Sequence, residues 1–482
     1  MKNKNTLFIV LTIAIGTFMS SLDSSVVNLV TPMIKESFGI TLSTVEWIVT
    51  AYLLVISSLL LTFGRISDLY GHKKVYLTGY IIFTTGSLLC GLSGNITMLI
   101  SFRVVQAIGA GMLFSTGPAI ITNAVPPSSR GKAFSISAMA VAFGLCTGPV
   151  VGGSLATLLG WQSIFFINIP IGILGFVMAI TQIPKDGERN TVPFDKLGSL
   201  LMFVSLMFML LPLSICGDYK IPIPVFVTLI TAGVVMVAVF AVYESRCQFP
   251  MLNLSLFKNH VFTAGNVAAL LVFMAQFIMA FLAPFYLQNL RMFSAFMTGM
   301  LYMPMPLATI LIAPISGVLA DRFNSRYICS AGAVVMTGGL LMMSFLNEDT
   351  STAYIIVSMI LTGIGSGLFQ TPNNSAVMGS ASQEHRGVAS GTLATMRNIG
   401  MVMGVAVSGA LFSSSQNNAM AIFASQGMTD SLQKGNAFIY ALHITFTAAV
   451  IVSFMAVIAS FVKGRSMGEK RIESKIKIEK VV

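Results

Sequence analysis

Long apolar segments recur along the whole of this 482-residue chain, and they constrain its fold more than any other feature. About 20 consecutive apolar residues are enough for a helix to cross the hydrocarbon core of a bilayer. Fourteen segments of this kind lie near residues 6–30, 45–64, 75–94, 97–123, 133–160, 162–183, 197–215, 222–243, 261–287, 296–318, 327–346, 353–379, 388–414 and 437–462. The sequence therefore predicts an all-α polytopic membrane protein with fourteen transmembrane helices.

Charge supports this prediction and gives an orientation. Only 9% of the residues are charged, whereas soluble domains contain about 25%. With the N-terminus in the cytoplasm, 22 of the 28 Lys and Arg residues fall on the cytoplasmic side, as the positive-inside rule requires. Both termini are then cytoplasmic. The net charge of +11 does not indicate nucleic acid, because the basic tail 463–482 is better explained by contact with lipid headgroups.

The chain contains none of the usual signs of an enzyme. Its five cysteines show no disulfide framework and no metal-ligand spacing. No nucleotide-binding loop or hydrolytic triad is recognisable, and no polar stretch is large enough to form a separate catalytic domain. We therefore expect no metal and no cofactor. Any work that the protein performs must draw on an ion gradient or on the gradient of its solute.

One carboxylate, Asp23, lies inside the first apolar segment. A charge near the middle of a bilayer costs about 2.5–3.5 kcal/mol on insertion scales, so it is by default a functional residue with a partner. Arg103 is the only basic residue deep in an apolar segment of the N-terminal half, and we expect the two to pair. A purely structural ion pair, or a hydrated Asp23, is the alternative. Glu46, at the start of the second segment, is expected to be solvated, with a position in a water-filled vestibule as the alternative.

The chain contains an internal repeat. Gly109 and Gly111 match Gly365 and Gly367 at an offset of 256 residues, and so does Arg130 with Arg386. The repeat predicts two pseudo-symmetric six-helix bundles with two helices inserted between them. The expected domains are 1–196 for the first bundle, 197–243 for the inserted helices, 244–462 for the second bundle and 463–482 for the tail. Parallel halves of this kind are typical of secondary transporters.

Charged turns recur with the repeat. Asp68 follows the second segment, and Asp321 with Arg322 follows the tenth. Asp68 could stabilise a helix N-terminus, or it could pair with Arg130 in one conformation only and so act as a gate; a permanently solvated turn is the alternative. The fifth segment holds Gly144, Gly148, Pro149, Gly152 and Gly153. Small residues at this spacing let another helix approach closely, and proline removes a backbone donor.

Several of these stretches resemble the major facilitator superfamily, and within it the fourteen-helix drug–proton antiporters. The stretches are Leu22–Asn28 with Pro32, Gly64–Lys74, Arg103–Gly109 and Gly144–Gly153. The resemblance covers essentially the whole chain. It implies that Asp23 and Arg103 serve proton coupling, that Asp68 and Asp321 govern gating, and that a large substrate cavity lies between the halves. The Gly144–Gly153 stretch favours export over uptake.

Positions that the two halves do not share are candidates for substrate contact. Arg397 has Val141 at the matching position, and it either holds an anionic group or caps helix carbonyls. Methionine and aromatic side chains can repack around different apolar ligands. The predicted substrate-binding residues are Asp23, Gln276, Phe277, Tyr302, Met303, Phe369, Asn373, Asn374 and Arg397.

The sequence thus predicts a proton-coupled antiporter that exports lipophilic compounds from the bacterial cytoplasm and works as a monomer. Monocationic, zwitterionic or neutral compounds fit best, because Asp23 is the only acidic residue expected deep in a span. A proton-coupled or facilitative permease for one metabolite or amphiphile is the alternative. A receptor or scaffold without transport activity would not need a charge pair inside the membrane.

Overall fold

The structure is a computed structural model, and it describes residues 4–126, 130–184, 195–215, 223–247, 254–381, 386–426 and 429–462. Within these ranges the chain is helical and contains no strand. It divides into two compact units. The first comprises Met1–Tyr243, Cys247–Met251 and Phe281–Met303; the second comprises Glu244–Arg246, Leu252–Ala280 and Pro304–Val482. The all-helical fold predicted from the apolar segments is confirmed for the described residues.

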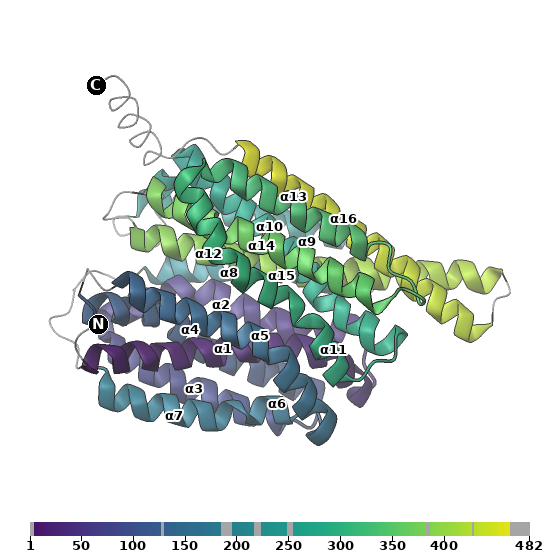
Figure 1. Cartoon of the computed structure of the whole chain (residues 1–482), viewed down its shortest axis with the longest axis horizontal. Coiled ribbons are helices and arrows are strands. Elements are labelled where there is room, and N and C mark those ends of the chain that lie inside the picture. The colour runs from purple at the N-terminus through teal and green to yellow at the C-terminus, as the bar shows by residue number, and fades with distance from the viewer. Residues whose placement is uncertain are drawn as a thin grey trace. The chain divides into compact units, whose positions relative to one another are not determined.

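The first unit is built around the long helix α1. Its helices are α1 (Lys4–Phe38), α2 (Leu42–Tyr70), α3 (His72–Gly91), α4 (Ile96–Ala124), α5 (Arg130–Leu159), α6 (Ser163–Phe166), α7 (Asn168–Gln182), α8 (Lys196–Ile215), α9 (Ile223–Arg246, nearly all of it) and α11 (Ala295–Tyr302), with the π-helical turn η3 (Tyr286–Leu290). Helix α1 contacts α2, α4, α5, α6, α7 and α11. Figure 1 shows α1 among α3, α4, α5 and α7. The middle of α1, where Asp23 lies, is therefore surrounded by protein.

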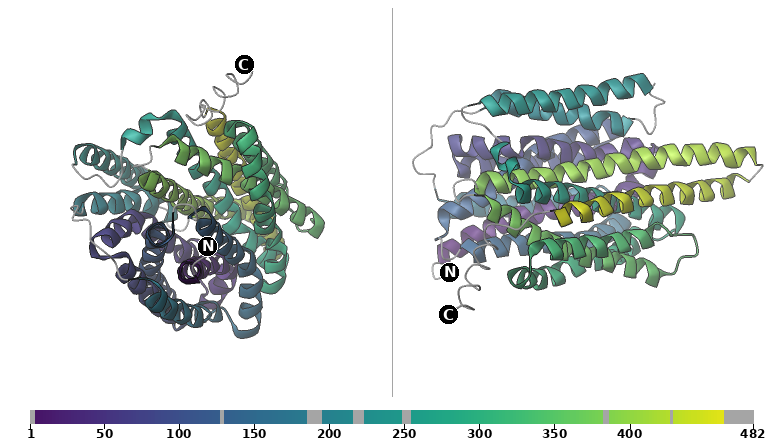
Figure 2. Two further views of the ribbon diagram at one scale, coloured as in Figure 1. Left: turned by 60° about the vertical axis from the view of Figure 1, so that its left-hand side comes forward. Right: turned by 90° about the horizontal axis from the view of Figure 1, so that it is seen from above.

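The second unit repeats the helix pairs of the first. Its helices are η2 (Leu254–Lys258), most of α10 (His260–Phe285), α12 (Pro304–Arg322), α13 (Ser325–Met343), α14 (Thr352–Ser380), α15 (Arg386–Ser425) and α16 (Asp430–Val462). Helix α14 packs against α12 and α13, as α4 packs against α2 and α3 in the first unit. The long helices α15 and α16 pack together and run side by side in Figure 2.

The same glycines make the same contacts in both units, as the internal repeat predicts. A Cβ added to Gly109 on α4 would lie 2.4 Å from the backbone nitrogen of Phe83 on α3. A Cβ added to Gly365 on α14 would lie 2.4 Å from the backbone nitrogen of Met336 on α13. Both positions bring two helix backbones together, and neither leaves room for a side chain. The repeat is thus a repeat of helix-to-helix contacts.

Twelve helical stretches within the described ranges are long and apolar enough to cross a membrane. The sequence predicted fourteen, and each predicted segment is helical. The two that fall short are the segments near 75–94 and 197–215. Helix α3 is long enough, with 20 residues, but its first residues are His72, Lys73 and Lys74. The apolar part of α8 among the described residues is the short stretch Leu197–Met209. The structure therefore supports twelve spans directly.

Helix boundaries differ from the predicted ones at three further places. Two predicted spans are broken: 162–183 divides into α6 and α7 at Ile167, and 296–318 divides into α11 and α12 at Met303. The predicted turn 64–74 is mostly helix, because α2 continues to Tyr70 and α3 begins at His72. Gly71 alone connects them with a φ of 103°, a conformation that favours glycine.

Candidate functional site

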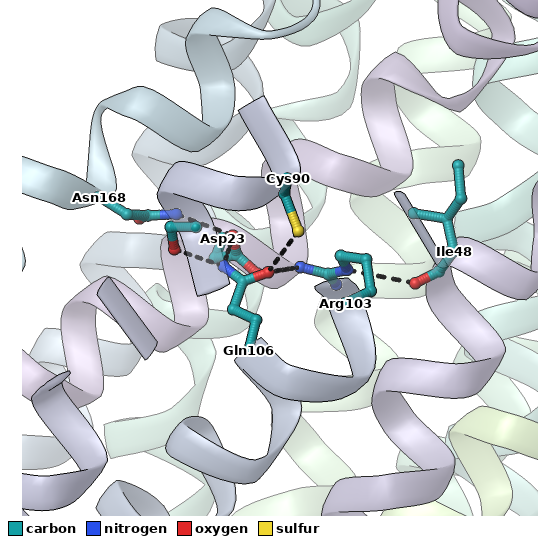
Figure 3. Close-up of polar contacts among 7 residues, drawn as sticks. Asp23, Ile48, Cys90, Arg103, Gln106 and Asn168 are labelled. Carbon is teal, nitrogen blue, oxygen red and sulfur yellow. Dashed lines mark hydrogen bonds and ion pairs between the residues drawn. The ribbon is translucent and has the colours of Figure 1, made fainter. Parts of the chain in front are cut away.

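Asp23 and Arg103 form the buried ion pair that the sequence predicts. Nη1 of Arg103, on α4, donates to Oδ2 of Asp23, on α1, over 2.7 Å. Both residues are only 1% exposed. Figure 3 shows them at the centre of a polar cluster formed by five helices. The pair thus lies within the first unit and is shielded from the surroundings of the protein.

Two side-chain amides complete the hydrogen bonds of the Asp23 carboxylate. Nε2 of Gln106, on α4, donates to Oδ1 of Asp23 over 2.8 Å, and Nδ2 of Asn168, on α7, donates to the same oxygen over 2.8 Å. Gln106 also donates to Oγ of Ser87 on α3 over 2.7 Å. An ionised carboxylate accepts hydrogen bonds only, so three donors around it fit the charged form of Asp23.

The Arg103 guanidinium has its own set of partners. Its Nη1 also donates to Oε1 of Gln106 over 2.7 Å, and its Nε donates to the backbone carbonyl of Ile48 on α2 over 3.2 Å. The Tyr52 ring lies 3.9 Å from the guanidinium carbon, close enough for a cation–π interaction. The hydrogen-bond partners of Arg103 thus lie on α1, α2 and its own helix α4.

This arrangement can respond to a proton in a simple way. A buried ion pair is stable when both charges and all donors are matched, and removal of one charge leaves the other buried and uncompensated. A proton on Asp23 removes the negative charge that holds Arg103. Gln106 contacts both members of the pair, so its hydrogen bonds must also change when Asp23 is protonated. The cluster therefore links the protonation of one side chain to the contacts of several helices.

Sequence reasoning did not assign a role to Gln106 or Asn168. Gln106 lies three residues after Arg103 on one helix, and residues at this spacing lie on the same face. Asn168 is a polar residue in an apolar stretch and is the first residue of α7. It reaches Asp23 because the break at Ile167 starts a new helix there. That break has no strong local marker in the sequence other than Pro170 nearby.

Glu46 was expected to be solvated, and this expectation is wrong. Glu46 is 0% exposed. Thr41 caps the N-terminus of α2 and Leu42 is its first residue, so Glu46 lies in the second turn. Its neighbours Val45 and Val49 are also buried. Asp23 is therefore not the only acidic residue buried in a span.

The predicted gating residues are described only in part. Asp68 lies 3.9 Å from Nη1 of Arg65 and 3.9 Å from Nε2 of His72. Burial raises the pKa of Asp68, and the nearby His72 and Arg65 oppose this rise. The side chains of Arg130, Asp321 and Arg322 lie outside the described residues. Pairing of Asp68 with Arg130 thus stays a prediction.

The glycines of α5 bring it close to α1, as their spacing predicts. A Cβ on Gly144 would lie 2.9 Å from the backbone oxygen of Phe18, and a Cβ on Gly148 would lie 2.8 Å from the Ser25 side chain. Gly152 faces Val26 on α1, and Gly153 faces Ala295 on α11. Helix α5 therefore contacts α1 along most of its middle.

Pro149 leaves one carbonyl of α5 without a helix donor. A proline has no N–H for the carbonyl four residues earlier, which belongs to Leu145. Oγ of Ser25, on α1, donates to this carbonyl over 3.3 Å. The proline therefore supports a contact between the two helices.

The predicted substrate-binding residues belong to both units. Asp23, Tyr302 and Met303 are in the first unit, and the others are in the second. Two of the latter are buried among helices: Phe369 is 1% exposed, and Asn373 donates to the carbonyl of Gly265 over 3.0 Å. Phe277 is half-buried. Contact of any of these residues with substrate stays a prediction.

A polar row in the second unit connects α10, α14 and α15. Ser366 donates to Oε1 of Gln276 over 3.3 Å, and Nε2 of Gln370 donates to Oγ of Ser366 over 2.6 Å. One helical turn further along α14, Oδ1 of Asn374 accepts a hydrogen bond from Nη2 of Arg397. We call Gln276, Ser366, Gln370, Asn374 and Arg397 the α14 polar row.

The fold is that of known membrane transporters. The structure of a bacterial homologue of the human lysosomal transporter Spinster, inward-facing and unoccupied, aligns with a TM-score of 0.71 at 15% identity, covering 96% of this chain and 98% of that one. A D-xylose–proton symporter aligns with a TM-score of 0.63 at 16% identity, covering 95% and 99%. At such identities the likeness concerns the fold alone.

The sequence profile of the Major Facilitator Superfamily matches residues 13–405, and the chain belongs to this family. The riboflavin transporter RibZ of Clostridioides difficile is 36% identical over 86% of this chain and 89% of its own length. The multidrug resistance protein Stp of Mycobacterium tuberculosis is 30% identical over 85% and 76%. The multidrug transporter protein MdtP of Bacillus subtilis is 30% identical over 87% and 77%. This chain is therefore a multi-pass membrane transporter of small molecules and not an enzyme, as predicted.

Proposed function

We propose that this transporter exports lipophilic monocationic, zwitterionic or neutral compounds across a bacterial cytoplasmic membrane in exchange for protons. The observation that carries the proposal is the fully buried Asp23–Arg103 pair. An ionisable pair at membrane depth is costly and is by default functional. Asp23 is thus the candidate proton carrier, and Arg103 is the group that responds to its protonation.

In this mechanism protonation and substrate release are linked. When Asp23 faces the outer side it binds a proton, and its hold on Arg103 weakens. When the protein opens inward, the proton leaves to the cytoplasm and Asp23 pairs with Arg103 again. One proton moving inward across 100 mV supplies about 2.3 kcal/mol. This corresponds to roughly a fifty-fold concentration ratio of a neutral substrate, since about 1.4 kcal/mol is tenfold.

Two observations support export of several compounds. The α1–α5 contact is formed by the Gly144–Gly153 stretch that resembles the antiporter signature. In addition, two of the relatives that cover most of this chain are named for multidrug resistance or transport.

We further propose fourteen spans with both termini in the cytoplasm. Helix α3 would be one of the additional two, because its 20 residues span about 30 Å and it packs against α4 and α7.

A permease for one specific metabolite is the second candidate. It is favoured by the 36% identity to a protein named as a riboflavin transporter. The Asp23–Arg103 pair fits this candidate as well, because a proton can drive either the uptake or the export of a single solute. The two candidates differ in how many solutes are transported, and an uptake permease would also move its solute in the same direction as the proton.

Reconstitution of the purified chain in liposomes tests both candidates. We would impose a pH gradient and measure the movement of ethidium and of riboflavin, together with pH inside the vesicles. The proposal expects gradient-driven ethidium transport opposite to the proton, and loss of gradient dependence in Asp23→Asn. Asp349→Asn removes a carboxylate that is exposed and serves as the matched control. Transport by Asp23→Asn that still follows the pH gradient would contradict the proposal, and transport of riboflavin alone would favour the permease.

A further inference from the structure

Arg103 and Arg397 both lie deep within candidate spans, and their surroundings are very different. Arg103 is bonded to a carboxylate, a side-chain amide and a backbone carbonyl. Arg397, on α15, donates to Oδ1 of Asn374, a neutral oxygen. Its Nε is buried and has no hydrogen-bond partner within the described part of the chain. Among the described residues, no carboxylate therefore lies within ion-pair distance of Arg397.

The sequence explains why no carboxylate can balance this charge locally. Helices α10, α14 and α15 contain no Asp and no Glu along their whole lengths. Arg397 lies nine residues inside the apolar stretch that begins at Val388. A cation at such a depth is costly unless an anion or several polar groups contact it. None of these three helices offers a carboxylate to Arg397, so an anionic ligand bound beside it would supply the missing negative charge.

The groups around Arg397 form one side of a polar site. The guanidinium carbon lies 5.4 Å from the centre of the Phe273 ring on α10, and Gln276 follows Phe273 by one helical turn. Gln276, Gln370, Asn374 and Arg397 are all half-buried, so part of each side chain is accessible. The α14 polar row therefore offers a fixed cation, amide donors and an aromatic face within the second unit.

We propose that Arg397 binds a carboxylate of the transported compound, with the amides of the α14 polar row beside it. This inference rests on the proposed function only in taking the ligand to be the transported solute. A guanidinium matches a carboxylate geometrically and can donate two hydrogen bonds to it. Among the compounds that the transporter would accept, the site selects zwitterionic amphiphiles that carry an acidic group.

A pair of dyes isolates the carboxylate. Rhodamine 110 is a zwitterion with a free carboxylate, and rhodamine 123 is its methyl ester. We would measure equilibrium binding of each dye to the purified full-length chain in detergent by fluorescence anisotropy. The wild-type chain should bind the acid at least about tenfold more tightly than the ester, since about tenfold is the effect of one charge-assisted hydrogen bond.

Variants separate recognition from folding. Arg397→Gln should weaken binding of the acid about tenfold or more and binding of the ester less than about threefold, so that the preference disappears. Arg397→Lys, which keeps the positive charge, should retain part of the preference for the acid. Arg326→Gln is the matched control, because Arg326 in the same unit also lies over an aromatic ring, 4.2 Å from Phe461. It should leave the preference unchanged.

Three outcomes would overturn the inference. The first is that Arg397→Gln weakens the binding of both dyes equally. The second is that the wild-type chain does not bind the acid more tightly than the ester, which includes binding neither dye. The third is that the Arg326→Gln control loses the preference for the acid. Binding in detergent needs no gradient, so this measurement does not depend on proton coupling. Failure of proton coupling and failure of carboxylate recognition are therefore distinguishable.

Discussion

The hydroxyl of Ser25 on α1 donates a hydrogen bond to the backbone carbonyl of Leu145 on α5 over 3.3 Å. Pro149 makes this possible, because it has no N–H to offer that carbonyl. The contact lies within two residues of Asp23 along α1. The helix that holds the proton-binding candidate is thus joined to α5 at the same level.

The Ser25–Leu145 bond can be tested by a double-mutant cycle. Ser25→Ala should destabilise the protein by about 0.5–1.5 kcal/mol, the usual net value of one hydrogen bond. In a Pro149→Ala background α5 has its own donor for Leu145, so the same change should have little effect. Thermal unfolding in detergent of all four proteins measures the difference. Equal effects of Ser25→Ala in both backgrounds would show that the bond is not specific to the proline.

Breaking the buried pair should cost more than replacing it. Arg103→Met leaves Asp23 charged and uncompensated, and we expect a loss of about 3–5 kcal/mol. The double change Asp23→Leu with Arg103→Met should recover much of this stability without recovering proton-coupled transport. Melting temperature and transport are measured on the same samples. A double variant as unstable as Arg103→Met would contradict this account of the pair.

Two adjacent glycines of α13 should respond in opposite ways. A Cβ on Gly339 would lie 2.7 Å from the backbone nitrogen of Thr362, whereas a Cβ on Gly338 would have nothing within 4 Å. Gly339→Ala should therefore destabilise the second unit. Gly338→Ala should raise stability by up to about 1 kcal/mol, because alanine favours a helix over glycine. Similar melting temperatures for the two variants would contradict the close α13–α14 contact.

Asp68 should make stability depend on pH. Burial raises the pKa of Asp68 above that of an unfolded chain, so the folded state binds the proton more tightly. Its contribution to stability is then present at low pH and is lost as pH rises through the folded pKa. Asp68→Asn should match the wild type at about pH 3 and be slightly more stable at about pH 7, on either side of the range in which carboxyls titrate. Melting curves across this pH range test the sign of the effect. An Asp68→Asn variant that is less stable than the wild type at neutral pH would contradict the prediction.

The sequence predicted those features that depend on single residues and local periodicity. Asp23 and Arg103 are conspicuous because each is a lone charge in an apolar segment. The repeat is visible because backbone contacts require glycine at fixed positions. Gln106 and Asn168 were missed because a neutral amide in an apolar helix has many uses, and only the packed structure brings it to Asp23.

Glu46 shows the opposite error. Its place near the start of a predicted span suggested contact with water, but residues around it in space decide its burial, and periodicity along α2 does not reveal them. The break between α6 and α7 is similar. It is local in the chain, yet its effect is to place Asn168 beside Asp23 on α1.

The repeated glycine contacts also bear on how such transporters can diversify. Helix pairs that meet through backbone atoms, as at Gly109 and Gly365, do not depend on the side chains that face elsewhere. Polar positions on other helix faces can therefore change without repacking either unit. The substrate specificity of such a transporter can then change at those positions while the helix packing of each unit stays the same.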